Sequence, residues 1–419
     1  MSEPKIKVPR GTFDVLGEQV AARLTLETRA RALLEAAGYE RIETPTMEST
    51  ELFSRGVGAS TDIVTKEMFT LTDGGGRSLT LRPEGTAPVC RAYVEHGMHK
   101  RRQPVKLWYL SSFYRHERAQ EGRYRQFWQV GVEAIGSEDP AVDAEAIVLL
   151  ATLLGELGVR GLKLRLSSLG SPASRVEYRA LLQAHLRAHE RQLSDEVRAR
   201  IDLNPLRAFD TDHPGTREVM SSAPLLIDHL DGDDLEHFAQ VRALLDAAEV
   251  AYEIDPTLVR GLDYYTRTLF EFTSDALGAQ SAVGGGGRYD GLVEQLGGPP
   301  APGIGWAAGV ERILLSREPQ PSVPPPLELF VALGEDTPEI RRDAFALLAE
   351  ARSAGLSAQM ELGGRSLKGQ LGQASALGAR YVAIVEGERA VLRDMQSAAQ
   401  EPIAIERLVH ALLRSRNAL

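Results

Sequence analysis

The chain has 419 residues, 43% hydrophobic and 25% charged, a composition typical of folded globular proteins and unlike that of disordered or collagen-like chains. At about 150 residues per domain, this length predicts two or three domains, and the net charge of −10 argues by itself against a nucleic-acid partner. The single Cys90 excludes an intramolecular disulfide, and because neither a signal peptide nor a membrane-spanning stretch is evident, we expect a cytoplasmic protein without membrane contact.

The N-terminal region predicts a helix followed by a short strand. Apolar residues recur at helical spacing over residues 18–37, and Gly38 is suited to end that helix. Residues 39–44 predict a strand that ends at Pro45, since proline lacks the N–H that a strand ladder uses.

Two longer strands are predicted over residues 105–115 and 126–135, joined as an antiparallel hairpin by a polar loop. Beyond them, residues 141–157 predict an apolar helix used for packing, and residues 172–250 are rich in helical patterns. Strands are expected again at 252–254 and 266–273, and a further helix at 309–316.

The C-terminal part is predicted to be a separate small domain. Residues 317–326, REPQPSVPPP, predict a linker because proline at this density continues neither a helix nor a central strand. After it, apolar strands at 327–333 and 381–385 alternate with helical patterns at 337–354 and 366–377, which predicts helices packed on a sheet.

Positive charge is concentrated in one stretch of this acidic chain. Residues 91–125 contain nine Lys or Arg against three Glu, a net charge of 9 − 3 = +6. Such a stretch favours phosphate groups, although a solvated basic face without a ligand is about equally compatible with the charge alone. The interleaved aromatic residues favour a built site, because they predict strands that hold the arginines in place.

The second strand of the hairpin has two chemically different faces. With a period of two, Gln129, Gly131 and Glu133 share one face, and Trp128 lies on the other with two valines. Two polar groups with a glycine between them suit the floor of a pocket for a small ligand. A solvent-facing strand surface is the alternative.

Three further segments are candidates for ligand binding. GGGGRYDG (284–291) permits close approach of a ligand to the backbone, or else forms a flexible loop. VRGLDYYT (259–266) suits recognition of a zwitterionic or polar aromatic ligand, or else a turn held by a salt bridge. GIGWAA (303–308) matches a dinucleotide-binding pattern, but no strand precedes it and no βαβ unit follows, so that interpretation is rejected.

Taken together, these segments resemble the class II aminoacyl-tRNA synthetases, and specifically the histidyl-tRNA synthetase family. The resemblance covers essentially the whole chain. The helix, strand and proline of 18–45 look like motif 1, YRHE and RYRQF within 114–127 look like motif 2, and GIGWAAGVER (303–312) looks like motif 3. RGTFD (10–14) resembles the usual N-terminal signature of the family, and LRPEGT (81–86) and RGLDYY (260–265) resemble segments that are more specific to the histidine family.

The resemblance implies an α/β fold of the α+β type. Its catalytic domain, 1–316, would be built on an antiparallel sheet, with motif 1 at about 18–45, motif 2 at about 105–135 and motif 3 at about 303–316. A helical insertion at about 172–250 would contact tRNA, the 317–326 segment would be a linker, and 327–419 would form an anticodon-binding α/β domain.

The same resemblance implies ATP with Mg²⁺, L-histidine and histidine tRNA as substrates, and a homodimer formed through motif 1. It implies two catalytic residues, Arg260 and Arg115, and no metal ligands in the chain. The ATP-binding residues it implies are Arg115, Glu117, Arg123, Phe127 and Arg312. The implied histidine-binding residues are Glu84, Thr86, Arg115, Gln129, Glu133, Arg260, Tyr264, Tyr265 and Tyr289, and Arg118 and Gln120 would belong to a loop that meets the tRNA acceptor end.

Two residues depart from the family pattern: Trp128 stands where histidine is common, and Ala119 where proline is usual. Since Trp128 points away from the Gln129 face, we expect it to change packing only. Two other functions compete with the synthetase hypothesis. One is the synthetase-like regulatory subunit of histidine biosynthesis, which normally lacks the C-terminal domain, and the other is a nucleotide-binding scaffold without chemistry.

Overall fold

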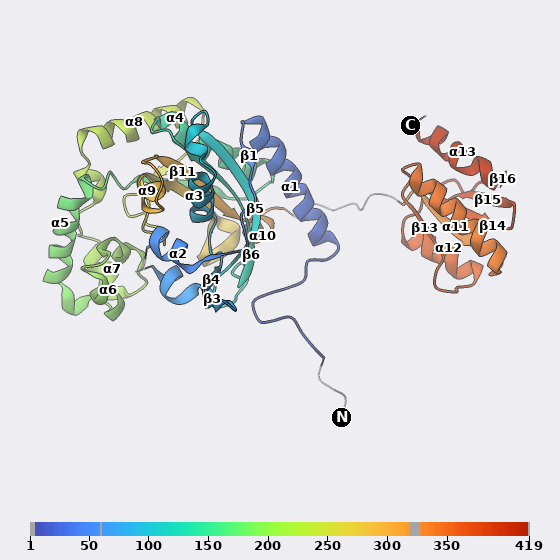
Figure 1. Cartoon of the computed structure of the whole chain (residues 1–419), viewed down its shortest axis with the longest axis horizontal. Helices are drawn as coiled ribbons and strands as arrows, with labels where there is room; N and C mark the ends of the chain where they lie inside the picture. The colour runs from blue at the N-terminus through green and yellow to red at the C-terminus, as the bar shows by residue number, and fades with distance from the viewer. Residues whose placement is uncertain (1–4, 59–60, 319–326, 418–419) are drawn as a thin grey trace. The chain divides into compact units, whose positions relative to one another are not determined.

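The computed structural model describes residues 5–58, 61–318 and 327–417 (Figure 1). The chain divides into two compact units, Met1–Gln320 and Pro321–Leu419. This division falls within the predicted 317–326 linker, of which residues 319–326 lie outside the described residues. Within the described residues, no helix is long and apolar enough to cross a membrane.

The first unit is built on an eight-stranded sheet in the order β1-β5-β6-β11-β10-β9-β7-β8. The six central strands run antiparallel to one another, which confirms the predicted antiparallel sheet, and only the two edge strands are parallel to the strand beside them. The strands are β1 Glu40–Arg41, β5 Val105–Tyr114, β6 Gln126–Ile135, β7 Leu162–Ser168, β8 Glu253–Ile254, β9 Thr266–Ser274, β10 Ala282–Arg288 and β11 Gly303–Gly309. The predicted hairpin is therefore confirmed as β5 and β6, whereas the strand expected over 39–44 has only two residues.

One face of this sheet is covered by helices and holds the main core. The helices are α1 Glu18–Ala36, α4 Pro140–Glu156, α8 Gly232–Ala247 and α10 Val310–Ser316, and Figure 1 shows α1 on one side of β5 and β6. Leu34, Leu150 and Val132 are fully buried here. Burial of one such side chain contributes about 1.5–3 kcal/mol. This packing fixes the sheet and leaves its opposite face for the site.

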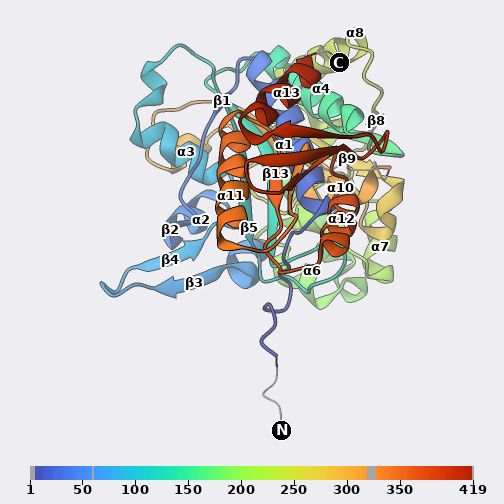
Figure 2. The ribbon, with the colours of Figure 1, turned by 90° about the vertical axis from the view of Figure 1, so that its right-hand side faces the viewer.

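The opposite face is bordered by short elements that the sequence did not reveal. They are α2 Thr50–Gly56, η1 Ile63–Glu67, α3 Thr86–Glu95, α9 Leu292–Gln295 and a second sheet of β2 Met47–Ser49, β3 Phe69–Thr72 and β4 Ser78–Leu81. In Figure 2 the β3–β4 hairpin projects away from the body of this unit. Strands of three or four residues carry too little periodicity to be recognised from sequence.

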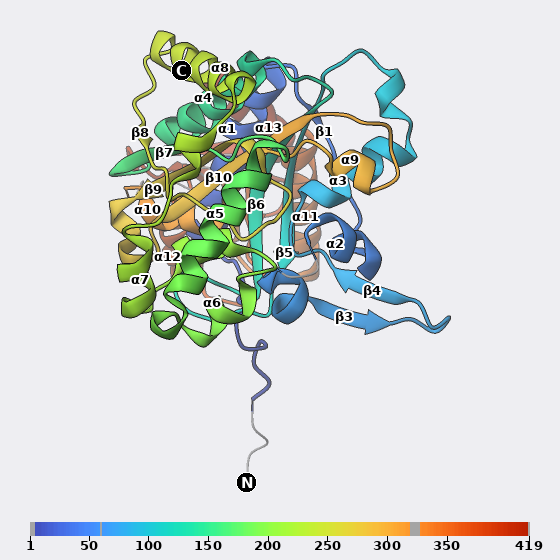
Figure 3. The same cartoon turned by 90° about the vertical axis from the view of Figure 1, so that its left-hand side faces the viewer.

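The helix-rich segment 172–250 has two packing environments. Its first part contains α5 Ser174–Ala188, α6 Asp195–Arg200 and α7 Pro214–Met220, which lie together on one side of the unit (Figure 3). Its last helix, α8, instead packs against α4 and contributes Phe238 to the core behind the sheet. The helix α8 therefore belongs to the layer that covers the sheet.

The glycine run forms a strand in the middle of the sheet, which excludes the alternative of a flexible loop. Gly284–Gly287 lie within β10, between β9 and β11. Glycine disfavours strands on propensity. Here the close approach of neighbouring backbones requires it, since a Cβ on Gly286 would lie 1.9 Å from the carbonyl oxygen of Gly305. The segment 303–308 is also a strand, β11, which agrees with the rejection of a dinucleotide-binding turn.

The second unit has a five-stranded sheet in the order β13-β12-β14-β15-β16, with helices on both faces. Its elements are β12 Leu329–Leu333, α11 Pro338–Ser353, β13 Ala358–Met360, α12 Leu367–Ala376, β14 Tyr381–Val385, β15 Arg389–Asp394, β16 Gln400–Ala404 and α13 Ile405–Asn417. The predicted small α/β domain is confirmed. The strands β13, β15 and β16 and the helix α13 were not predicted.

Candidate active site

The floor of the candidate site is a row of small residues across the large sheet. In the strand register, Glu271 of β9 pairs with Gly285, Gly285 with Ala307, Ala307 with Gly131, and Gly131 with Tyr109 of β5. Successive side chains of a strand point to opposite faces, so these five residues share one face. Gly285 and Ala307 leave room above the sheet, whereas the ring of Tyr109 covers Gly131, where a Cβ would lie 2.4 Å from its Cζ.

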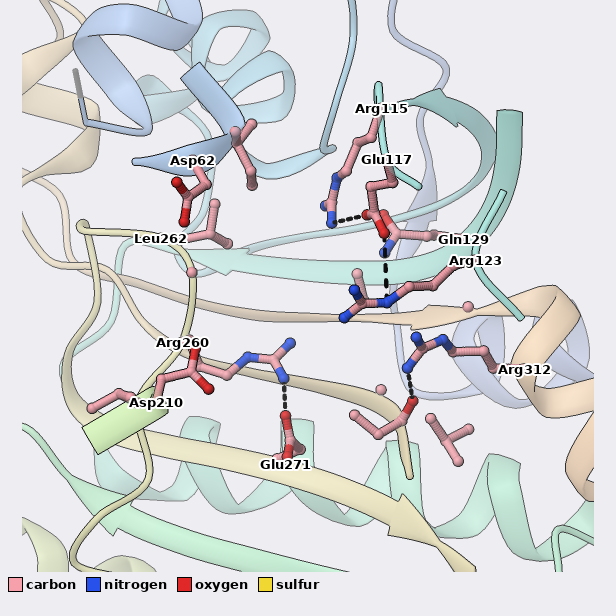
Figure 4. A pocket seen from close by; sticks show the side chains of 18 of the residues that line it. Asp62, Arg115, Glu117, Arg123, Gln129, Asp210, Arg260, Leu262, Glu271 and Arg312 are labelled. Carbon is pink, nitrogen blue, oxygen red and sulfur yellow. Dashed lines mark hydrogen bonds and ion pairs between the residues drawn. The ribbon is translucent and has the colours of Figure 1, made fainter. Parts of the chain in front are cut away.

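Above this floor lies an open cavity of about 560 Å³ that is rich in charged side chains (Figure 4). Six arginines line it, Arg165 and Arg207 among them. The four that the sequence predicted come from separate parts of the chain: Arg115 and Arg123 lie in the loop between β5 and β6, Arg260 precedes β9, and Arg312 lies in α10. Six carboxylates line the cavity as well. The arginines among them can donate paired hydrogen bonds to phosphate and carboxylate groups of a ligand.

Glu117 lies between the first two arginines. Its carboxylate is 3.8 Å from Nη1 of Arg115 and 3.5 Å from Nε of Arg123 (Figure 4). Arg115 also donates from Nε to the carbonyl of Pro83 at 2.9 Å, and its guanidinium lies 5.2 Å from the ring centroid of Phe127. These contacts connect the loop to the strands and orient Arg115 toward the cavity.

The other two predicted arginines, Arg312 and Arg260, are fixed by hydrogen bonds to neighbouring loops and strands. Arg312 donates to the carbonyl oxygens of Gly122 at 3.0 Å and Ala282 at 2.5 Å, and its pKa is lowered by burial and by the positive charge of Arg123. Arg260 donates from Nη1 to the carboxylate of Glu271. Burial lowers the pKa of Arg260, but the charge and hydrogen bond of Glu271, together with the nearby Tyr265 and Tyr264, outweigh burial and raise it.

A smaller pocket of about 50 Å³ opens beside the arginine cavity. Five residues line both spaces, so a ligand that spans them would contact the same arginines and the same floor. The shared residues are Arg115, Gln129, Arg260, Leu262 and Ala307. The remaining lining residues of the small pocket include Glu84, Thr86, Tyr109, Tyr264, Tyr265 and Tyr289.

Glu84 sits at the start of α3, where free backbone N–H groups bind a carboxylate. It accepts hydrogen bonds from the backbone nitrogens of Thr86 at 2.7 Å and Ala87 at 3.1 Å. The first N–H groups of a helix have no partner within the helix, so this carboxylate satisfies two of them. Burial nevertheless raises the pKa of Glu84, because solvent is excluded from it.

Glu133 is fully buried at the back of the small pocket. Its Oε1 accepts from the Thr86 hydroxyl at 2.8 Å and from the Tyr109 phenol at 3.4 Å. Burial raises the pKa of Glu133 to about 8, and the neighbouring hydroxyls of Tyr289 and Thr86 oppose that shift. A buried carboxyl group with a raised pKa beside a cavity is typical of a functional site.

Three phenols complete this pocket. The rings of Tyr264 and Tyr265 meet edge-on at 4.8 Å between centroids, and Tyr264 lies 6.0 Å from Tyr289. Tyr264 also donates to Glu84 at 3.5 Å. Burial raises the pKa of all three phenols, so they remain protonated and act as hydrogen-bond donors at neutral pH.

Three of the predicted site residues line neither space: the buried Glu133, which lies behind Thr86 and Tyr109 of the small pocket, and two residues of a loop. Arg118 and Gln120 are exposed in the loop between β5 and β6, and the backbone of Gln120 pairs with that of Arg123. Trp128 is 36% exposed and lies on the β6 face opposite Glu133, as the alternation predicted. There the guanidinium of Arg23 lies 5.8 Å from its ring. The remaining predicted residues lie together around the two connected spaces.

The sequence did not reveal three residues that contact this site. Tyr109 bonds Glu133 from β5, Glu271 binds Arg260 from β9, and Arg165 of β7 lies beside Glu271 in the lining of the cavity. Arg165 and Glu271 belong to strands that pair across about a hundred residues of chain, and neither lies in the basic stretch 91–125. Tyr109 lies in the predicted hairpin, where the aromatic pattern indicated a built site without assigning Tyr109 a contact.

The arrangement suits a nucleotide joined to a small polar molecule. The arginine cavity can hold phosphates, and the enclosed pocket offers carboxylates and phenols to an amino group and a polar ring. Among the described residues, no group of three or more His, Cys, Asp or Glu is placed to hold a metal ion. An antiparallel sheet with such a site on its open face is the architecture of class II aminoacyl-tRNA synthetases.

Comparison with known proteins defines the family. The family model described as histidyl-tRNA synthetase matches residues 11–313. Histidine–tRNA ligase of Desulfitobacterium hafniense is 45% identical, covering 96% of each chain, and that of Streptomyces coelicolor is 47% identical, covering 99% of this chain and all of the relative. The crystal structure of apo S. aureus histidyl-tRNA synthetase aligns with a TM-score of 0.81 at 36% identity, covering 97% of this chain and all of that one. The chain belongs to the histidyl-tRNA synthetase family.

Proposed function

We propose that this protein attaches L-histidine to its tRNA in an ATP-dependent reaction. Histidine and ATP give histidyl-adenylate and pyrophosphate, and the histidyl group then passes to the terminal ribose of the tRNA with release of AMP. The observation that carries the proposal is the junction of the two spaces, where Arg115, Gln129 and Arg260 line both. The carboxylate of histidine and the α-phosphate of ATP react at such a junction.

ATP occupies the arginine cavity in this proposal. Arg115 holds the α-phosphate, Arg123 and Arg312 hold the outer phosphates, Phe127 stacks on adenine, and Glu117 accepts from its amino group. Charge develops at the α-phosphorus during attack, and fixed arginines stabilise it without rearranging. The attacking carboxylate needs positioning more than acid–base help.

Histidine occupies the small pocket. Glu84, Thr86 and Gln129 receive its α-amino group, while Glu133 and the pair Tyr264 and Tyr265 contact its imidazole. Tyr289 lines the wall of the pocket. A buried acceptor such as Glu133 rejects side chains that lack a matching N–H, because the carboxyl group would then remain buried without that partner.

Mg²⁺ enters as part of the MgATP substrate. Mg²⁺ keeps several waters and is usually bound by substrate phosphates with one or two protein carboxylates. The cavity wall fits this mode, since it includes Glu117 and Glu271 but the described residues contain no cluster of three acidic ligands. We therefore expect no tight metal binding without the nucleotide.

The tRNA contacts several parts of the chain. The exposed Arg118 and Gln120 meet its acceptor end, helices of the segment 172–250 contact its body, and the unit 327–419 binds the anticodon. This last unit carries eleven basic and twelve acidic residues, so anticodon binding there depends on local contacts and base recognition.

The protein acts as a cytoplasmic homodimer joined through the motif 1 region, 18–45. Apolar side chains on and before α1 support this, since Leu16 is 73% exposed, Leu24 57% and Val20 39%. Exposed apolar residues grouped on one element favour a protein interface. Analytical ultracentrifugation of Leu24→Glu beside the wild type tests the contact.

Pyrophosphate exchange tests the reaction itself. The purified protein is incubated with ATP, labelled pyrophosphate and each of the twenty amino acids, and we expect exchange with histidine alone. Histidine binding without exchange would instead support the regulatory-subunit function, and exchange with another amino acid would contradict the assignment of Glu133.

A further inference from the structure

A chain of alternating charges crosses the sheet at one end of the cavity floor. Arg165 of β7 and Glu271 of β9 pair in the strand register, and Nη1 of Arg165 lies 3.3 Å from Oε1 of Glu271. The other oxygen of Glu271 binds Nη1 of Arg260. Behind them, Nε of Arg165 donates to Asp255 at 2.6 Å. The chain therefore runs from Asp255 through Arg165 and Glu271 to Arg260.

These groups are shielded from solvent to different degrees. The side chain of Arg165 is 36% exposed, that of Arg260 24% and that of Glu271 13%. Ionic interactions are screened less where solvent is excluded. The contact between Glu271 and Arg260 is thus stronger than an ordinary surface ion pair.

The geometry leaves Arg260 able to bind a ligand while it is held. Within the described residues its hydrogen bond to Glu271 uses Nη1, and Figure 4 shows the rest of the guanidinium reaching into the cavity. A guanidinium has five N–H donors, so one carboxylate fixes its orientation without using all of them. Gly285 faces Glu271 in the register, and a Cβ there would lie 3.5 Å from Cζ of Arg260.

We infer that Glu271, held in turn by Arg165, is a positioning residue for Arg260. The inference rests on the proposed function, in which Arg260 contacts the α-phosphate and the histidine carboxylate. Glu271 keeps the guanidinium over the glycine floor before substrate arrives, and Arg165 prevents Glu271 from turning away. Neither Glu271 nor Arg165 needs to touch the reacting atoms.

The test compares Glu271→Gln and Arg165→Met in steady-state pyrophosphate exchange. Because small misplacements of a catalytic group cost up to about a hundredfold in rate, we expect Glu271→Gln to lower kcat about tenfold to a hundredfold. The KM for histidine should stay within about threefold of the wild type, since Glu84, Glu133 and the phenols of the small pocket are unchanged. Arg165→Met leaves the pair of Glu271 and Arg260 in place, so it should lower kcat by only about threefold to tenfold.

The double variant separates positioning from a general structural role. If Arg165 acts through Glu271, the double variant has the same kcat as Glu271→Gln, whereas independent roles give the product of the two losses. Glu253→Gln, an exposed change in β8 at the position paired with Arg165, is the matched control and should behave as the wild type.

A kcat within twofold of the wild type in Glu271→Gln would overturn the inference, and so would multiplicative losses in the double variant. Should Glu271→Gln fold poorly, as thermal melting would reveal, the kcat of Arg165→Met decides between the two outcomes: a loss of threefold or more supports the inference, and a wild-type value overturns it. A wild-type protein without histidine-dependent exchange would refute the proposed function instead, so the two failures are distinguishable.

Discussion

The two connected spaces of the site bind by different physical means. The arginine cavity is open, about 560 Å³ in volume, and its cationic side chains remain partly hydrated. The small pocket holds about 50 Å³ and is built from buried carboxyl groups and phenols. The open space suits a charged ligand that is recognised by its phosphates, and the enclosed one suits a ligand that is recognised by the position of each polar atom.

This difference indicates that the open cavity contributes affinity through many modest interactions and that the small pocket contributes specificity. In an open cavity each charge contributes modestly, because water and salt screen it. In a dry pocket a single unmatched polar group is costly, because it has lost its water and gained no partner. Removal of one group should therefore have a larger effect in the small pocket or at the junction than at the rim of the cavity.

The largest effect is expected at the junction. Arg260→Ala should lower adenylate formation about a thousandfold, because a fixed cation is lost where the transition state gains charge. Histidine should still bind, since Glu133 and the phenols are untouched. Pyrophosphate exchange and calorimetric titration with histidine measure the two quantities, with the exposed Arg191→Ala as control. Exchange near the wild-type level would refute a catalytic role for Arg260.

A change inside the small pocket should act on histidine alone. Glu133→Gln replaces a buried acceptor with an amide of the same shape, and we expect the KM for histidine to rise about a hundredfold. The KM for ATP should stay within about twofold, because the arginine cavity is unchanged. Glu138→Gln, five residues along the chain and exposed, is the matched control. An equal rise in both KM values would mean that the two spaces do not recognise separate ligands.

A change at the rim of the open cavity should be milder. Arg123 is 45% exposed, so Arg123→Ala should raise the KM for ATP only about tenfold. Histidine affinity, measured by calorimetry without ATP, should not change. The ATP effect should also shrink as salt concentration rises, since exposed charges are screened. A loss of histidine affinity would place Arg123 in the small pocket instead.

The smallest effect concerns stability and its dependence on pH. The pKa of Glu133 is raised from the ordinary 4.5 to about 8, so between these pH values the folded protein keeps a proton that the unfolded chain releases. The contribution of Glu133 to the free energy of unfolding therefore falls as pH rises through this window. Glu133→Gln has no such proton, so its Tm should exceed that of the wild type by about 3 °C or more at pH 8, and by less at pH 5. A Tm difference that does not change with pH would contradict the raised pKa.

The sequence predicted the parts of this site that follow a local rule. Alternation along β6 placed Gln129 and Glu133 on one face and Trp128 on the other, and the structure has this arrangement. Periodicity also predicted the strands β5 and β6 and the helix α4 that covers the opposite face of the sheet. The roles of the individual site residues remain predictions, because only binding and rate measurements test them.

Other parts depended on information that a single sequence does not display. The contribution of Glu271 requires the register between β7 and β9, two strands about a hundred residues apart in the chain. The glycine run was not predicted as a strand, because glycine has a low strand propensity. Its strand conformation depends on the neighbouring strands, which leave no room for a Cβ. Sequence periodicity reports which face a residue occupies, whereas tertiary pairing decides which residues meet.

The crowded floor has a consequence for how ligand preference could change, in evolution or by engineering. A Cβ on Gly305 would lie 2.4 Å from the carbonyl oxygen of Val132, and one on Gly285 would lie 2.6 Å from the carbonyl oxygen of Phe270. Single substitutions on the floor are therefore blocked by neighbours that cannot move. New amino-acid preference has to be introduced from the walls, at positions such as Thr86 and Tyr264, with the sheet beneath kept as an unchanged platform.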